Sequence, residues 1–181
     1  VAMFTPEPPV LPEAALDDIR AFLRLEPDND DPLLAALAVA ALSHAEAFTR
    51  QIFLRRAVTE RLTVSSSWQR LGATPVTAIT SMVGLPAEGA SFALPVHAYM
   101  IDIDLNYDGW VRVMEPGIAG RIDVTYQAGM AASWDALPEP LRLATMRLLG
   151  HLHAVRDDPD DKGPPAAVAA LLRPWRRMRL S

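Results

Sequence analysis

The chain has 181 residues, of which 50% are hydrophobic and 22% charged, with a formal net charge of −5 and no cysteine. This composition predicts a folded chain of one domain and leaves room for a second small lobe. The missing cysteine excludes disulfides, thiolate nucleophiles and cysteine-based zinc sites. The acidic balance argues against a general nucleic-acid binder, whose footprint would be a basic face.

The first residues lack the basic start and apolar run of a signal peptide. The longest continuous apolar stretch, residues 33–42, is far shorter than the roughly 20 residues that span a bilayer. We therefore expect a soluble protein that is made in a cytoplasm and does not contact a membrane.

Two helices are predicted in the N-terminal part, after a proline-rich extended arm at residues 1–11. The first covers about residues 12–24, with Pro12 in its first turn. The second covers about residues 30–52 and begins near Asp30 or Asp31. Its apolar side chains recur at helical spacing and predict a single buried face: Leu34, Leu37, Ala41, Ala45, Phe48 and Ile52.

From residue 57 the hydrophobic period changes from 3.6 to 2, which predicts a β section over about residues 57–127. Strands are expected near residues 57–64, 76–83, 96–104, 110–114 and 121–127, separated by glycines and prolines. Glu60 is the one polar misfit on the apolar side of the first strand.

Helix returns at about residues 139–156, and a run of acids and prolines then precedes a short helix and the C-terminal tail. Because helical and strand patterns segregate, the sequence predicts an α+β fold. It is a small helical bundle, with two N-terminal and one or two C-terminal helices, and an antiparallel β section inserted between them. We expect one domain over residues 1–156, and a hinge, short helix and docking tail over residues 157–181.

The last segment, residues 168–181, carries four arginines and no acid in an acidic protein. Tryptophan and arginine dominate the energetics of protein interfaces. We therefore expect this segment to dock into another protein, and residues 173–181 to be loosely ordered in the free protein. The candidate docking residues are Leu171, Leu172, Arg173, Trp175, Arg176, Arg177, Met178, Arg179 and Leu180.

Residues 104–115 match the spacing of an EF-hand calcium loop, with Asp104, Asn106, Asp108 and Glu115 as the candidate ligands. The flanking sequence reads as strands, and residues 116–117 (Pro-Gly) forbid an outgoing helix. The favoured interpretation is a hairpin whose turn uses residues 106–109, because Asp-Gly is a strong hairpin signal.

Catalytic chemistry has little support in the sequence. His151 and His153 lie two positions apart on a predicted helix and so cannot share a metal ion. The serine run at residues 65–67 lacks a nucleophile elbow, and there is no glycine-rich phosphate loop. We expect no enzymatic activity, no catalytic residues, no metal and no cofactor.

The order of the pieces resembles the head–tail connector (adaptor) proteins of tailed bacteriophages and of phage-derived gene transfer agents. The resemblance rests on residues 16–25, the acidic loop and helix that follow, and residues 75–82 and 122–129. It continues through residues 137–141, the end of the next helix at 154–156, and residues 167–176 with their Leu-Leu-Arg-Pro-Trp-Arg finish.

The resemblance implies a structural particle protein at the head–tail interface, assembled in a bacterial cytoplasm. Such adaptors form a ring, usually of twelve copies, between the portal protein and a stopper or other tail component. DNA passes through the ring without sequence-specific binding, and the tail residues given above would bind the portal. Two alternatives stay open: a nucleic-acid-binding protein that uses the arginine-rich tail, and a calcium-binding module at residues 104–115.

Overall fold

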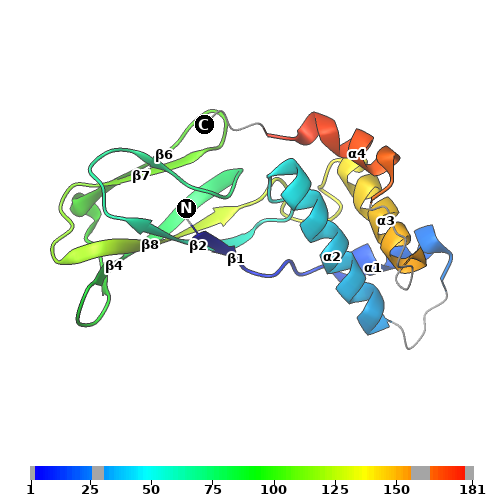
Figure 1. The fold of residues 1–181 in the computed structure, drawn as a ribbon, viewed down its shortest axis with the longest axis horizontal. Coiled ribbons are helices and arrows are strands. Elements are labelled where there is room, and N and C mark those ends of the chain that lie inside the picture. Colours follow the sequence, from blue (N-terminus) through cyan, green and yellow to red (C-terminus); the bar gives the residue numbers. More distant parts are fainter. Residues whose placement is uncertain (1–2, 26–30, 156–163, 178–181) are drawn as a thin grey trace. The chain divides into compact units, whose positions relative to one another are not determined.

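The computed structural model describes residues 3–25, 31–155 and 164–177, which form two compact units (Figure 1). One unit, the β unit, consists of residues up to Pro8 together with Arg55–Met130. The other, the helical unit, consists of Pro9–Leu54 and the residues from Ala131 onward. Helices and antiparallel strands are thus segregated, which confirms the predicted α+β fold with a β section inserted between helices. The prediction of a single domain over residues 1–156 stays a prediction.

The β unit contains two antiparallel sheets. The larger has the strand order β1-β2-β8-β4-β5, and the smaller has the order β3-β7-β6. The bounds of the strands are Met3–Pro6 (β1), Arg56–Thr63 (β2), Gln69–Arg70 (β3), Val76–Pro86 (β4), Phe92–Ala93 (β5), Tyr99–Ile103 (β6), Gly109–Val113 (β7) and Ala119–Ala128 (β8), with a 3-10 turn at Val96–Ala98.

Alternation of side chains builds the core of this unit. In β8, Ile122, Val124 and Tyr126 are fully buried, and the residues between them lie on the outer side of the strand. The smaller sheet contributes Val111 and Val113, which are also buried. β7 begins at Gly109, where a Cβ atom would lie 2.8 Å from the Leu71 side chain. Glycine is therefore the residue that lets these two segments approach this closely.

Three strands were not anticipated from the sequence: β1, β3 and β5. Residues 3–6, expected only as part of an extended arm, pair in antiparallel register with β2, with Met3 opposite Arg61 and Pro6 opposite Val58. The strands β3 and β5 have two residues each, so their sequences are too short to show a period of two.

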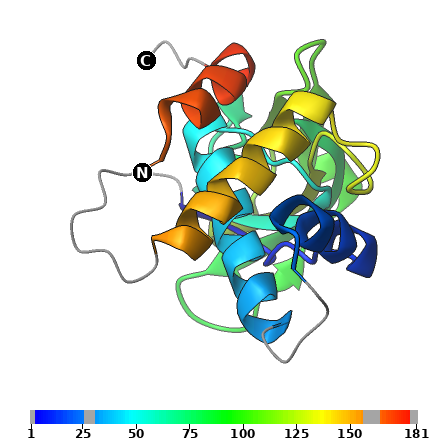
Figure 2. The same ribbon diagram turned by 90° about the vertical axis from the view of Figure 1, so that its right-hand side faces the viewer.

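The helical unit contains α1 (Glu13–Leu23), α2 (Asp31–Thr49), α3 (Glu139–Ala154) and α4 (Ala166–Leu172), followed by a 3-10 turn, η2 (Arg173–Trp175). Figures 1 and 2 show α3 lying against α2, and α4 packs on both. Trp134, in the loop before α3, is buried, and its indole N–H donates a hydrogen bond of 3.0 Å to Asp18 of α1.

The buried face of α2 is rotated from the predicted one. It consists of small and branched side chains, which let α3 approach closely, whereas Phe48 stays 37% exposed. The prediction is wrong for Phe48, because the wide stripe of alanines permitted more than one choice of face. The residues that line the observed face are Leu34, Ala38, Ala41, Leu42, Ala45 and Thr49.

One described helix segment, Pro32–Thr49 of α2, is long and apolar enough to cross a membrane when judged by length and composition alone. The continuous apolar run at residues 33–42 is shorter than this 18-residue segment, because a few polar residues interrupt the segment without making it hydrophilic on average. In this structure 39% of that segment is buried, and α2 packs against α3.

Candidate functional site

The C-terminal segment begins as part of the core of the helical unit. Val168 and Leu172 of α4 are each 2% exposed, and α4 packs on α3. Of the two adjacent leucines predicted to dock, Leu172 is therefore a core residue, and Leu171 is half-buried. The helical spacing of four residues from Val168 to Leu172 explains why these two share the buried side.

The segment after α4 lies against the C-terminal end of α2. That helix ends at Thr49, three residues before the predicted end at residue 52, because Arg50 adopts a left-handed conformation with φ of 57°. The turn is held by Glu46, whose backbone carbonyl accepts the N–H of Gln51 at 3.2 Å and whose carboxylate accepts the N–H of Phe53 at 2.8 Å. The last carbonyls of a helix have no intrahelical partner, so this end can accept further hydrogen bonds.

Two hydrogen bonds attach the tail to this helix end. The backbone N–H of Arg177 donates to the carbonyl of Thr49 at 3.0 Å, and the side-chain amide of Gln51 donates to the carbonyl of Trp175. On the tail, the donor is the backbone N–H of Arg177 and the acceptor is the backbone carbonyl of Trp175. The attachment therefore fixes the path of the chain through residue 177.

The same attachment determines which tail side chains face solvent. Arg173 and Arg176 are exposed, and Trp175 is half-buried. The guanidinium of Arg176 lies 5.7 Å from the ring centroid of Phe48, a cation–π distance. The half-exposed Phe48 therefore belongs to the surface formed by the tail.

This arrangement corrects the expectation of a loosely ordered tail for residues 173–177, which are packed on α2. The physical reason is that Pro174 turns the chain at the end of α4 toward a helix terminus with unsatisfied carbonyls. The remaining predicted docking residues, Met178, Arg179 and Leu180, lie outside the described residues.

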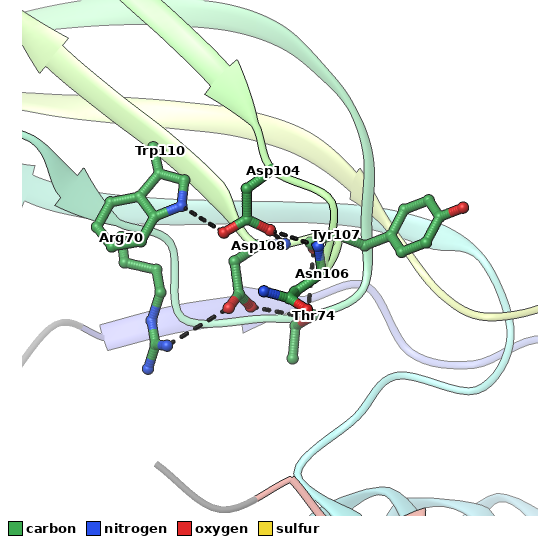
Figure 3. Close-up of polar contacts among 7 residues, drawn as sticks. All are labelled: Arg70, Thr74, Asp104, Asn106, Tyr107, Asp108 and Trp110. Atoms are coloured by element: carbon green, nitrogen blue, oxygen red, sulfur yellow. Dashed lines mark hydrogen bonds and ion pairs between the residues drawn. The ribbon is translucent and has the colours of Figure 1, made fainter. Parts of the chain in front are cut away.

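The second candidate site, residues 104–115, comprises the five-residue loop and the second strand of the β-hairpin that β6 and β7 form (Figure 3). Both oxygens of the Asp104 carboxylate accept hydrogen bonds. One accepts the backbone N–H groups of Asn106 at 2.8 Å and Asp108 at 3.0 Å, and the other accepts the indole N–H of Trp110 at 3.1 Å. Asp104 therefore organises the loop.

The carboxylate of Asp108 is also engaged. It accepts a hydrogen bond from the Thr74 hydroxyl at 3.2 Å and lies 3.4 Å from the guanidinium of Arg70 (Figure 3). The backbone at Tyr107 turns through the left-handed region, with φ of 59°. The turn was predicted to end at residue 109. In the structure it ends at residue 108, because Gly109 already pairs with Ile103 in the hairpin.

Glu115, the twelfth residue of the calcium-loop pattern, lies at the other end of the hairpin. Its N–H donates to the carbonyl of Ala98, whereas Asp104 pairs with Asp108 at the loop. Ala98 and Asp104 are six residue steps apart along the strand, or about 20 Å at roughly 3.3 Å per step. Calcium ligands must all lie about 2.3–2.6 Å from one ion, so this hairpin cannot close an EF-hand site.

Across residues 3–25, 31–155 and 164–177, no group of three or more histidine, aspartate and glutamate side chains is placed to hold a metal ion. The EF-hand pattern is instead explained by hairpin formation, since aspartate side chains commonly bond the backbone of a tight turn.

Sequence reasoning missed a surface on one face of the sheet β3-β7-β6. The guanidinium of Arg112 on β7 lies 4.7 Å from the centroid of the Trp68 ring and 2.9 Å from the sulfur of Met100 on β6. Trp68 and Met100 are 41% and 47% exposed. The alternation of Trp110 and Arg112 within a predicted strand was the available signal for such a face.

Comparison with known proteins gives no match to a protein-family model and no match to a curated protein sequence.

Solved structures do match, and three similar chains come from gene transfer agent (GTA) particles. One is in the neck of an empty particle computed with C6 symmetry, at 24% identity and a TM-score of 0.78. A second is in the virion of the native particle, at 24% identity and a TM-score of 0.77. A third is in the neck of a native particle computed with C12 symmetry, at 26% identity and a TM-score of 0.72.

Each match covers 99% of this chain and 97% of the GTA chain. The likeness therefore includes the helical unit, the inserted β unit and the C-terminal segment rather than one shared motif. The chain has the fold of proteins that occur in GTA particles, two of them in particle necks.

Proposed function

We propose that this chain is a structural protein of the neck of a phage-like particle, and that within the neck it forms the adaptor ring between the portal and the stopper or tail. The observation that carries the proposal is the match over 99% of the chain to neck chains of GTA particles. Under this proposal the chain catalyses no reaction and binds no cofactor.

Ring formation is the second part of the proposal. The GTA necks that contain similar chains were computed with C6 and C12 symmetry. A repeated head-to-tail contact closes into a ring when its rotation permits. We propose a ring of twelve copies, which assembles on the portal and leaves an axial channel for DNA.

The C-terminal segment is the proposed portal-docking element. It presents Arg173 and Arg176 to solvent beside the half-buried Trp175, on a base fixed by hydrogen bonds to the end of α2. Arginines can pair bidentately with carboxylates of a partner, and tryptophan supplies a large apolar contact. Because residues 173–177 are already positioned, docking costs less ordering entropy than docking of a flexible tail would.

The arginine-rich tail also raises the alternative of nucleic-acid binding. Phosphate binding by arginines depends steeply on salt, because it releases condensed counterions. Here Arg176 lies over Phe48, and the protein as a whole carries a net charge of −5. A mixed aromatic and basic surface on an acidic protein suits a protein partner better than a phosphate backbone, and it lets DNA pass without being held.

Electron microscopy of the protein alone and mixed with the portal protein of the same gene cluster tests the proposal. We expect the protein to form a ring on the portal. A monomer in the absence of portal is compatible with the proposal. A chain that never associates with assembled portal at any salt concentration would refute the adaptor role. Salt-sensitive binding to duplex DNA in the absence of portal would support the nucleic-acid alternative.

A further inference from the structure

Among the described strands, none pairs with the outer side of β6 in the sheet β3-β7-β6. Met114 donates to the carbonyl of Ala98 at 2.8 Å, and Asp104 donates to the carbonyl of Asp108 at 3.0 Å. Hydrogen-bonded pairs alternate along an antiparallel ladder, so the even-numbered residues of β6 bond to β7. The backbone groups of Tyr99, Ile101 and Ile103 therefore point away from β7, and no described strand pairs with them.

The opposite edge of the same sheet is also open. Leu71 donates to the carbonyl of Gly109 at 2.8 Å, so Leu71 and Gln69 direct their backbone groups toward β7. By the same alternation, Trp68 and Arg70 direct theirs outward. In the described part of the chain, β7 is the only strand that pairs with β3.

The β6 edge has little of the usual protection against pairing with another strand. Exposed edges normally carry charged side chains, proline or a bulge. In β6 the one charged residue is Asp102, there is no proline, and the register with β7 is unbroken from Tyr99 to Ile103. Ile101 is 46% exposed although Val111, opposite it, is fully buried. Within the described residues, the apolar side chain of Ile101 is thus left partly uncovered at this edge.

Side chains on one face of the sheet form two rows across the three strands. The first row runs from Trp68 through Arg112 to Met100, joined by the cation–π and sulfur contacts described above. The second row consists of Arg70, Trp110 and Asp102, which are in register. Each row therefore has one end at the β3 edge and the other at the β6 edge.

The two ends of each row are chemically complementary. In the first row an indole ring stands at the β3 edge and a thioether at the β6 edge, and sulfur–aromatic contacts are favourable. In the second row a guanidinium stands at the β3 edge and the exposed carboxylate of Asp102 at the β6 edge. If a second copy of the same sheet lay alongside, its Trp68 would meet Met100 and its Arg70 would meet Asp102.

We propose that β6 of one copy pairs with β3 of the next copy, so that the sheet continues from copy to copy around the ring. The inference rests on the proposed ring. Because β3 and β6 both run antiparallel to β7, they run parallel to each other, as copies related by a rotation require. Met100 then lies beside Trp68 of the next copy, and Asp102 beside Arg70 of the next copy.

The contact is small, because β3 has two residues and β6 has five. Its area is well below the roughly 1,200 Å² that a stable isolated complex needs. The pairing therefore holds in a closed ring on the portal, where every copy makes the contact at both edges, and not in a free dimer.

Disulfide cross-linking tests the pairing, and the absence of cysteine from the chain makes it clean. In the variant Trp68→Cys/Met100→Cys, the two positions within one copy are separated by two strand spacings, about 10 Å. A disulfide needs Cα atoms within about 7 Å, so only cysteines of neighbouring copies can join. We expect oxidation on the portal to give a ladder of multimers, and each single variant to give at most dimers.

A charge reversal tests the second row. Asp102→Arg places an arginine beside Arg70 of the next copy and should weaken ring assembly on the portal on the order of tenfold or more. Glu88→Arg is the matched control, since Glu88 is exposed in the loop between β4 and β5 and undergoes the same change of charge. It should assemble normally.

Rings on the portal without a cross-linked ladder, or with equal assembly of both arginine variants, overturn the edge pairing and leave the adaptor function standing. Failure of the unaltered protein to join the portal counts against the adaptor function itself. If the double-cysteine variant does not assemble under reducing conditions, the comparison of Asp102→Arg with Glu88→Arg decides the question.

Discussion

The hydroxyl of Tyr126 donates a hydrogen bond of 2.9 Å to the carboxylate of Glu60, and both side chains are fully buried in the β unit. The same carboxylate oxygen accepts the N–H of Gly72 at 2.7 Å, and the Tyr126 oxygen accepts the N–H of Ala73 at 3.0 Å. Glu60, the polar misfit of the sequence pattern, thus ties β2 and β8 to the loop between β3 and β4. A buried carboxylate that lacks such partners would be strongly unfavourable.

Removing the Tyr126 hydroxyl should destabilise the protein. Tyr126→Phe takes one donor from Glu60 and leaves the N–H of Ala73 without its acceptor, which costs about 1–3 kcal/mol for buried groups. Urea unfolding followed by tryptophan fluorescence measures the loss. Tyr107→Phe is the matched control, because Tyr107 is 59% exposed, and its free energy of unfolding should not change. Equal stability of the two variants would contradict the role of the buried network.

The two leucines at the end of α4 should separate core packing from surface contact. Leu172→Ala removes a side chain that is 2% exposed and should lower the free energy of unfolding by about 2–5 kcal/mol. Leu171→Ala, at the half-buried neighbour, should cost less than half as much. Thermal and urea unfolding of both variants check this order. A reversed order would mean that α4 packs through its other face.

Charge reversal on the tail should abolish portal docking without unfolding the protein. Arg173 and Arg176 are exposed, so Arg173→Glu/Arg176→Glu should leave the melting temperature nearly unchanged. It should weaken portal binding more than the double alanine variant, because like charges meet the portal carboxylates. Binding is measured by co-sedimentation with assembled portal. Arg121→Glu, an exposed reversal on β8, is the control and should bind normally.

Trp175→Ala should weaken the same interaction through loss of apolar contact. Burying such a side chain contributes roughly 1.5–3 kcal/mol, and a ring multiplies each contact through avidity. Removing residues 174–181 also removes both hydrogen bonds to the end of α2, so it should lower stability slightly as well as prevent docking. Normal portal binding by Trp175→Ala would move the docking surface elsewhere.

Calcium should not affect stability. A filled site would stabilise the protein by about 3 kcal/mol at a hundredfold excess over Kd. We expect the same melting temperature in millimolar calcium and in chelator. Asp104→Ala should lower it equally in both, because three N–H groups lose their acceptor. A calcium-dependent rise that disappears in Asp104→Ala would restore the metal interpretation.

The helices were predictable because their signals are local. Pro12 and Pro138 occupy the caps of α1 and α3, and both helices end within two residues of the expected positions. The buried face of α2 was harder to predict, since alanines surround the helix and only the partner decides which of them is covered. Phe48 was misassigned for this reason.

The strands β1, β3 and β5 depend on contacts that are distant in sequence. β1 acquires strand geometry from its pairing with β2, more than fifty residues later. The glycine at position 72 also depends on a distant contact. A Cβ there would lie 2.5 Å from the ring of Phe4 in β1, and the sequence around Gly72 gives no sign of that strand.

The candidate docking segment was recognisable from its composition, whereas its attachment was not. The tail shows its arginines and tryptophan directly, but the acceptors are the Thr49 carbonyl and the Gln51 amide, which have no distinctive sequence pattern. The two rows on the smaller sheet were missed because Trp68 precedes a strand of only two residues.

The insertion of the β unit between α2 and α3 has a consequence for synthesis of the chain. Every strand is complete once Ala128 has left the ribosome, whereas α2 waits for α3 and α4 to cover its apolar face. Domains generally form as units during translation, so the β unit can fold first while α2 is still exposed. During that interval the exposed apolar face of α2 makes the nascent chain prone to aggregation.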